Sequence, residues 1–105
     1  NGFEKDKALS RRFSKVDIDE PSTKTAYLIL KGLKSKYEEF HKVRYSKEAL
    51  KAAAILAKKY LREKFLPDSA IDLIDEAGAK YKLRGKKLIT KSDIESIVAS
   101  IANIP

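Results

Sequence analysis

Four signals for the start of a helix divide this chain into segments of similar length. Ser22 and Ser46 can each accept a hydrogen bond from the unpaired backbone N–H groups of a first helical turn. Pro67-Asp68 combines a residue that tolerates a first turn with a carboxylate that complements the helix dipole. Thr90 precedes Asp93 at the spacing of a capping box. The pattern predicts four helices that begin near these positions.

Apolar residues recur at steps of three and four within each of these segments, which places them on one helical face. The predicted inward faces are Ala26, Leu30, Leu33, Tyr37 and Phe40; Leu50, Ala53, Ala54, Ala57, Tyr60 and Leu61; Ala70, Ile71, Ile74, Ala77 and Tyr81; and Ile94, Ile97, Val98 and Ile101. Gly85 is a C-terminal stop for the third helix. Residues 88–90 are expected to pair with 43–45 as a very short strand pair. The predicted fold is mainly α, a bundle of about four core helices.

Composition excludes several classes of protein. The chain is 105 residues long and 43% hydrophobic, which is enough to bury the core of one domain without disulfides or metal. It contains no Cys, so disulfides, thiolate zinc sites and cysteine nucleophiles are absent. Its longest apolar runs are far shorter than the roughly 20 residues that span a bilayer, and no signal-peptide pattern stands at its start. We expect a soluble, cytoplasmic protein with no membrane partner.

Basic side chains outnumber acidic ones by 23 to 15, which gives a formal net charge of +8. Such an excess can attract nucleic acid. The lysines, however, are dispersed and interleaved with acids, and the sequence lacks a recognition helix dense in Arg, Asn and Gln. A solvated basic surface is the favoured interpretation. A basic helical module that binds nucleic acid is the alternative.

The catalytic centre of an ATPase is not found in this chain. The segment around Gly85 has neither the upstream glycine nor the hydroxyl of a phosphate-binding loop. His41 is the only imidazole, and it is expected at the surface or at a helix end. Asp72, Asp75 and Glu76 are expected to point outward, where they are either solvated or form ion pairs with nearby lysines. The chain alone is therefore predicted not to be an enzyme and to hold no metal.

Two adjacent arginines, Arg11 and Arg12, stand at the end of a predicted helix, just before an alternating stretch that resembles a strand. At such a position they can reach the phosphate of a neighbouring subunit. From the spacing alone, a surface basic pair is the favoured interpretation.

Several stretches together resemble the end of the first AAA+ module of Clp unfoldases, in the order found in that family. They are FEKDKALSRRF (3–13), DEPS (19–22), GLK (32–34), YE (37–38), VRY (43–45), FLPD (65–68) and AIDLIDEA (70–77). The resemblance covers essentially the whole chain. It implies that residues 1–19 end the large subdomain, that 20–102 form the helical lid, and that 103–105 begin a linker to a second module. The short connection between Arg84 and Ile89 resembles the ClpA branch.

The resemblance also implies roles for individual residues. Arg11 and Arg12 resemble the arginine fingers that act in trans on the ATP site of the adjacent protomer. Ile29 and Leu33 resemble lid positions that pack on adenine, although an ordinary core position is the competing interpretation for both, most of all for Leu33. The predicted contacts at the start of the next helix, beside the nucleotide, are Pro67, Asp68 and Ala70. Many relatives have Lys where this chain has Ser69.

The implied function is that of a lid and arginine-finger fragment of an ATP-dependent Clp unfoldase. The parent protein is expected to be an ATPase that uses ATP or ADP with Mg²⁺, whereas the fragment alone is expected to hold no nucleotide tightly. Its implied partners are neighbouring protomers in a homohexamer. A ClpP-type peptidase and protein substrates would be contacted through regions outside these residues.

Overall fold

The computed structural model describes residues 20–102. Its elements are α2 (Thr23–His41), β1 (Arg44–Tyr45), α3 (Lys47–Tyr60), α4 (Asp68–Leu83), β2 (Leu88–Ile89) and α5 (Lys91–Ile101). The two strands pair in parallel, with Arg44 opposite Leu88 and Tyr45 opposite Ile89. The predicted mainly α fold of four helices and one small strand pair is therefore confirmed. The helix and strand predicted over residues 5–19 lie outside the described residues.

The predicted helix starts are present. The side chain of Ser22 caps α2, that of Ser46 caps α3, and Thr90 forms a capping box with Asp93 at the start of α5. Pro67 stands at the N-cap of α4, without a side-chain hydrogen bond. Because each cap satisfies N–H groups that a first turn leaves unpaired, the boundaries of three helices follow from short local sequence signals.

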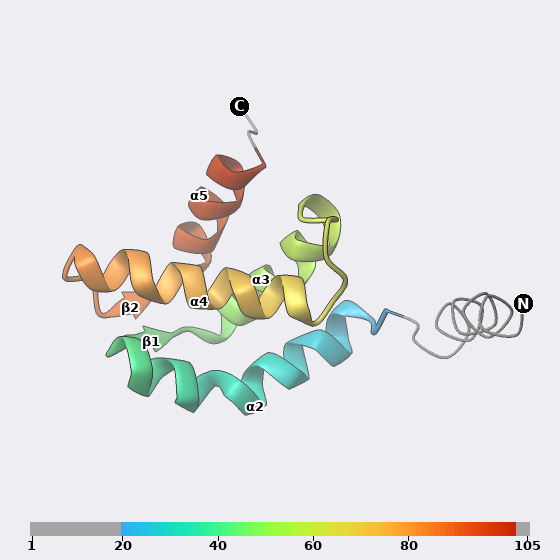
Figure 1. Cartoon of the computed structure of the whole chain (residues 1–105). Coiled ribbons are helices and arrows are strands. Elements are labelled where there is room, and N and C mark those ends of the chain that lie inside the picture. Colours follow the sequence, from blue (N-terminus) through green and yellow to red (C-terminus); the bar gives the residue numbers. More distant parts are fainter. Residues whose placement is uncertain (1–19, 103–105) are drawn as a thin grey trace, which may run out of the picture.

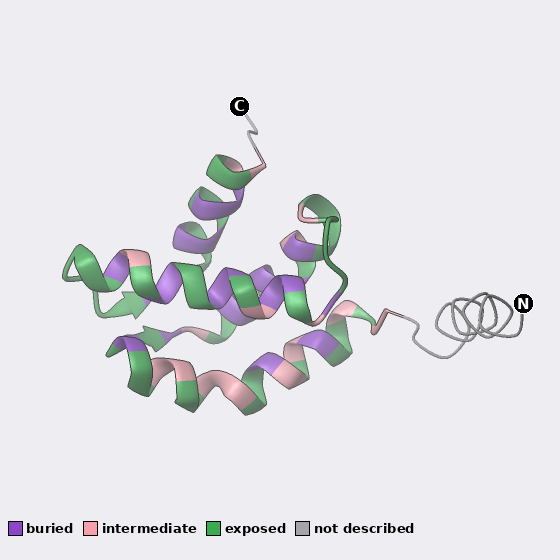
Figure 2. Ribbon diagram, in the orientation of Figure 1, coloured by how far each residue is buried: buried purple, intermediate pink, exposed green. Residues whose placement is uncertain are grey.

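Helix α3 lies at the centre of the bundle and packs against α2, α4 and α5. Helices α2 and α4 lie side by side and begin at the same end of the molecule (Figure 1). The buried residues line the inner sides of all four helices (Figure 2). On α3 these are Ala49, Leu50, Ala52, Ala53, Ala54 and Ala57. Small side chains on the central helix allow its neighbours to approach closely.

Three predicted core positions are wrong. Phe40 is 72% exposed, Ile101 is 49% exposed, and Tyr60 is also exposed. The face of α2 that turns inward contains Ala26, Leu30 and His41, and Phe40 lies on one flank of that face. A periodic pattern identifies a face only to within about one helical position, so residues at its edge are easily assigned to the wrong side.

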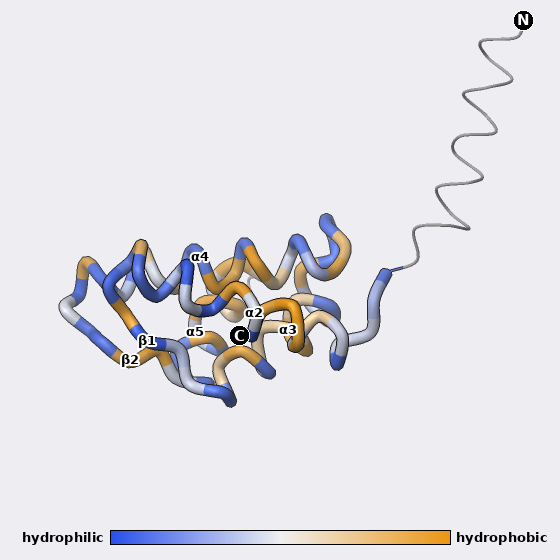
Figure 3. Tube along the Cα trace, turned by 90° about the horizontal axis from the view of Figure 1, so that it is seen from below, coloured by the Kyte–Doolittle hydropathy of each residue, from blue (hydrophilic) through white to orange (hydrophobic). Residues whose placement is uncertain are grey.

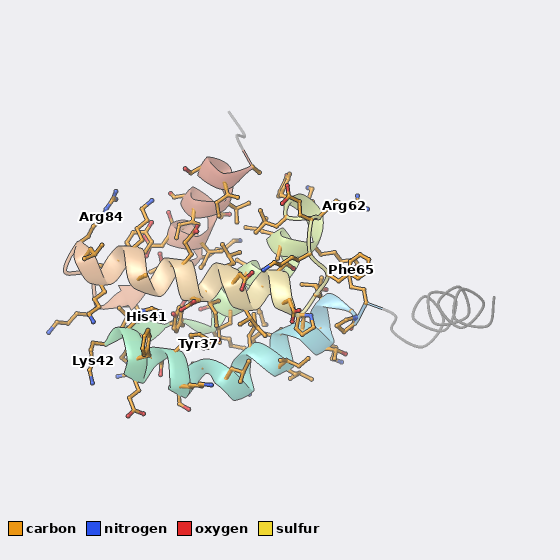
Figure 4. The ribbon with its side chains drawn as sticks, in the orientation of Figure 1. Tyr37, His41, Lys42, Arg62, Phe65 and Arg84 are labelled. Atoms are coloured by element: carbon orange, nitrogen blue, oxygen red, sulfur yellow. The ribbon has the colours of Figure 1, made fainter. Side chains whose placement is uncertain are left out.

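His41 is buried rather than on the surface, with 5% of its area exposed, although it does end a helix as predicted. Its Nε2 lies 2.6 Å from Oδ1 of Asp75 on α4. The ring therefore joins the end of α2 to the middle of α4. Figure 4 shows His41 and Tyr37 between these two helices.

Tyr45 on β1 adds a second connection at the same place. Its hydroxyl donates a 2.6 Å hydrogen bond to the carbonyl of Ile74, and its backbone N–H donates to Oε2 of Glu38. Burial, followed by the nearby Asp75 and Glu38 carboxylates, raises the pKa of the Tyr45 hydroxyl far above its ordinary value. The hydroxyl therefore stays protonated and remains a donor. We call His41, Tyr45, Asp75 and Gly78 the α2–α4 clamp.

Gly78 permits this clamp because it has no side chain. A Cβ at this position would lie 2.5 Å from Oη of Tyr45 and would overlap the ring of His41. By contrast, nothing lies within 4 Å of a Cβ at Gly32, which also stands within a helix.

We predict that Gly78→Ala lowers the free energy of unfolding by about 2 kcal/mol or more, because the added methyl group forces apart a closely packed contact. Gly32→Ala is the matched control and should raise stability by up to about 1 kcal/mol, since Ala is the better helix former. Urea unfolding followed by circular dichroism measures both. Equal effects of the two substitutions would contradict the close approach at Gly78.

The capping box of α5 contains a buried carboxylate. Burial alone raises the pKa of Asp93, but hydrogen bonds from Lys86 and Thr90 outweigh it and hold that pKa below its ordinary value. A carboxyl whose pKa is lowered by folding stabilises the native state above its unfolded pKa of about 3.9. That contribution is lost as the pH falls through the folded-state pKa.

We predict that Asp93→Ala costs about 1–2 kcal/mol at pH 7, because it removes the acceptor for the Thr90 backbone N–H in the capping box and leaves Lys86 without its carboxylate. The difference from the unmodified protein should shrink as the pH is lowered below the folded-state pKa of Asp93. Glu95→Ala, an exposed acid on the same helix, should change stability little at either pH. A cost that stays the same in acid would show that the ionised carboxylate is not responsible.

Candidate functional site

The first half of the predicted site lies on α2. Ile29 and Leu33 are one turn apart and are both half-buried. They lie on the flank of α2 beside the fully buried Ala26 and Leu30. The core interpretation of Leu33 is thus only half right, because part of its apolar side chain remains open to a ligand or to another domain.

The second half of the predicted site is the start of α4. Pro67 is half-buried at the N-cap, and Asp68, the first residue of the helix, is exposed. Ala70 is fully buried in the core, so its side chain contributes close packing rather than open surface. Asp68 is the only one of the five predicted contact residues that has an ionisable side chain. The site presents apolar surface and the N-terminus of a helix, and this combination is suited to binding rather than to bond cleavage.

The loop before α4 is fixed to the start of α2. The backbone N–H of the buried Leu66 donates a 2.8 Å hydrogen bond to Oε2 of Glu20. At the other side of the loop, Nζ of Lys64 lies 2.5 Å from Oδ2 of Asp72, and this hydrogen bond raises the pKa of Lys64. The pair confirms the predicted pairing of Asp72 with a lysine. The first contact joins this loop to the residues just before α2, and the second joins it to α4.

Sequence reasoning missed the role of Glu20. It stands next to Pro21, within the DEPS stretch (19–22) that carries part of the family resemblance. Its partner is a backbone N–H 46 residues further along the chain. No local pattern specifies such a contact.

A hollow of about 340 Å³ lies between the end of α3, the first turns of α4 and the end of α5. It is lined by Tyr60, Leu61, Arg62, Glu63, Lys64, Ser69, Asp72, Leu73, Glu76, Ile101 and Ala102. Ser69 is buried there, and its hydroxyl has no hydrogen-bond partner among the described residues. None of the five predicted nucleotide contacts lines this hollow, so the predicted site and the hollow are separate features.

The remaining predictions concern the two arginines, metal binding and the membrane. Arg11 and Arg12 lie outside the described residues. Within residues 20–102, His, Cys, Asp and Glu form no group of three that could hold a metal ion. No helix in that range is long and apolar enough to cross a membrane.

Comparison with known proteins places this chain in one family. Residues 22–105 match the family described as the AAA lid domain. The chain is 52% identical over 107 residues to a ClpA homolog protein of Fuscovulum blasticum, and the match covers 98% of the chain and 14% of that protein. It is 53% identical over 81 residues to the chaperone protein ClpB of Brucella melitensis, over 77% of the chain and 9% of that protein. Relatives of this kind do not support the nucleic-acid alternative.

Solved structures agree with this family assignment. An Hsp104–casein complex of S. cerevisiae in its extended conformation matches with a TM-score of 0.82 and 44% identity, over 97% of this chain and 18% of that chain. An S. cerevisiae Hsp104–ADP complex matches with a TM-score of 0.81 and 43% identity, over 98% and 18% respectively. The chain thus spans less than a fifth of the length of these relatives. It belongs to the AAA lid domain family, as the form of that domain found in Clp and Hsp104 proteins.

Proposed function

We propose that this chain is the lid that closes over ATP or ADP in the first ATPase module of a Clp protein unfoldase. The observation that carries the proposal is the half-buried apolar flank formed by Ile29 and Leu33 on α2. In a member of the AAA lid family, such a flank offers packing surface for the flat, apolar faces of adenine. An Hsp104 relative of very similar fold has been solved as an ADP complex, which supports nucleotide as the ligand.

The two halves of the site contribute differently. Ile29 and Leu33 pack on the base, while Pro67 and Asp68 lie at the start of α4, where a helix N-terminus favours negative charge. Ala70 lets this start pack closely on the core. The phosphate-binding loop and the Mg²⁺ ligands belong to the large subdomain of the parent protein. Opening and closing of the lid would then couple the state of the nucleotide to motion of the whole domain.

The α2–α4 clamp supports such coupling. It joins the end of α2 to the middle of α4 through His41 and Asp75, and the Leu66–Glu20 hydrogen bond joins the other ends. Connected at both ends, the two helices move together. A small displacement at the nucleotide is therefore transmitted to the far end of the lid rather than absorbed between its helices.

Arg11 and Arg12 complete the proposal. We assign them to the segment that reaches the ATP site of the adjacent protomer in a homohexamer, where their charge would stabilise the transferred phosphate in the transition state. The connection between α4 and β2 comprises only residues 84–87, which supports a parent of the ClpA type. Such a parent would deliver unfolded substrates to a ClpP-type peptidase.

We predict that Ile29→Asp in the full parent protein weakens nucleotide binding at this module about tenfold or more, since it places a carboxylate against an apolar base near negative phosphates. Leu28→Asp is the matched control, because Leu28 is exposed on another face of α2. Titration with a fluorescent ADP analogue, in a parent whose second module cannot bind nucleotide, measures the effect. Equal affinities of the two variants would contradict the lid site.

We predict that replacing both Arg11 and Arg12 with Ala lowers ATP turnover at this module about a hundredfold or more, while nucleotide binding and the folded lid persist. The control replaces Lys5 and Lys7 with Ala, which removes the same charge from the same predicted helix. Turnover is measured in hexamers whose second module is inactive. Normal turnover in the arginine variant would remove the finger assignment without affecting the proposed lid.

A further inference from the structure

Although many lysines are dispersed and interleaved with acids, most of the net charge of this protein lies in one short segment without acids, which corrects the expectation of an evenly dispersed basic surface. Residues 80–91 form the end of α4, the following connection, β2 and the first residue of α5. Six of these twelve residues are Lys or Arg, and none is acidic. Since the whole chain carries a net +8, the other 93 residues have an excess of only two positive charges. We call residues 80–91 the basic turn.

The cations of the basic turn are crowded together. Lys80 Nζ, Arg84 Cζ and Lys86 Nζ lie 5.7, 6.0 and 5.6 Å from the centre of the Tyr81 ring. Attraction to the ring offsets part of their mutual repulsion. The three positive groups nevertheless repel one another, and an external anion bound among them would reduce this repulsion.

The protein itself supplies little opposite charge here. Lys86 pairs with Asp93 at 2.7 Å, and that carboxylate also accepts hydrogen bonds from Thr90. Within residues 20–102, no other cation of the basic turn forms an ion pair. Arg84 lies at the end of α4, far from Arg62 and Phe65 (Figure 4). The basic turn is thus positively charged, and its cations other than Lys86 can pair with carboxylates of a partner.

Apolar side chains stand within the same segment. Leu83 is 88% exposed and Leu88 is 48% exposed. Figure 3 shows that the connection between α4 and β2 is mostly hydrophilic. An apolar side chain that is so fully exposed between cations gains from burial against a partner, at about 25 cal/mol per Å² of area removed from water.

We propose that the basic turn is a docking surface for an acidic protein segment that also carries apolar side chains. Glutamates or aspartates of the partner pair with Lys82, Arg84 and Lys87, while its apolar residues cover Leu83 and Leu88. Nucleic acid fits less well, because the one aromatic residue of the turn, Tyr81, is buried and offers no surface on which bases stack. This inference does not depend on nucleotide binding.

The test uses the 105-residue chain and a short fluorescent peptide of glutamates interspersed with leucines. Lys82→Glu combined with Lys87→Glu should weaken binding about tenfold or more, because each reversal replaces attraction with repulsion. The control, Lys31→Glu combined with Lys58→Glu, changes the net charge equally at exposed positions outside the turn and should change affinity less than about threefold. Fluorescence anisotropy at about 0.1 M salt measures each dissociation constant.

Further variants separate the apolar contribution to peptide binding from the contribution of charge. Leu83→Ser should weaken binding severalfold, whereas Leu28→Ser, at another exposed leucine, should not. Three results would each overturn the proposal: equal losses in the two double-charge variants, equal binding of a peptide with Gln in place of Glu, or tighter binding of a single-stranded DNA of matched charge. Circular dichroism of every variant confirms that the altered side chains, all exposed, leave the fold intact.

Discussion

The close approach of α4 to the end of α2 is the constraint on which this lid depends. It requires Gly78, because any side chain there would occupy the space of His41 and Tyr45. Once the helices are this close, His41 reaches Asp75 and the Tyr45 hydroxyl reaches the carbonyl of Ile74. Both hydrogen bonds are short and at least partly buried, so breaking either would leave a polar group without a partner away from water.

The position of the clamp explains how a small helical domain can act as one body. α3 contributes mainly alanines to the centre, and these allow α2, α4 and α5 to pack around it. The clamp then fixes α2 to α4 at one end, and Glu20 fixes the loop before α4 at the other. Apolar packing alone permits helices to slide, whereas these directional contacts select one arrangement. The proposed nucleotide surface and the basic turn lie on elements held by this frame.

Much of the fold could be predicted because its signals are local. Ser22, Ser46 and Thr90 cap their helices as their sequence context indicates. The expected strand pair and the stop at Gly85, whose φ is +74°, are also present. The candidate site was predicted only through family resemblance. The structure adds that Ile29 and Leu33 remain half-open, which periodicity could not distinguish, and it confirms the inward position that periodicity predicted for Ala70.

The sequence by itself determined where the helices begin, which class of fold they form and which family the chain resembles, since caps, periodicity and motifs act over a few neighbouring residues. Only the tertiary structure decided that His41 is buried, that Phe40 is exposed and that Glu20 binds the N–H of Leu66. It also placed three cations around Tyr81. These outcomes depend on how whole helices rotate and approach one another, and this geometry is set by the sum of many distant contacts.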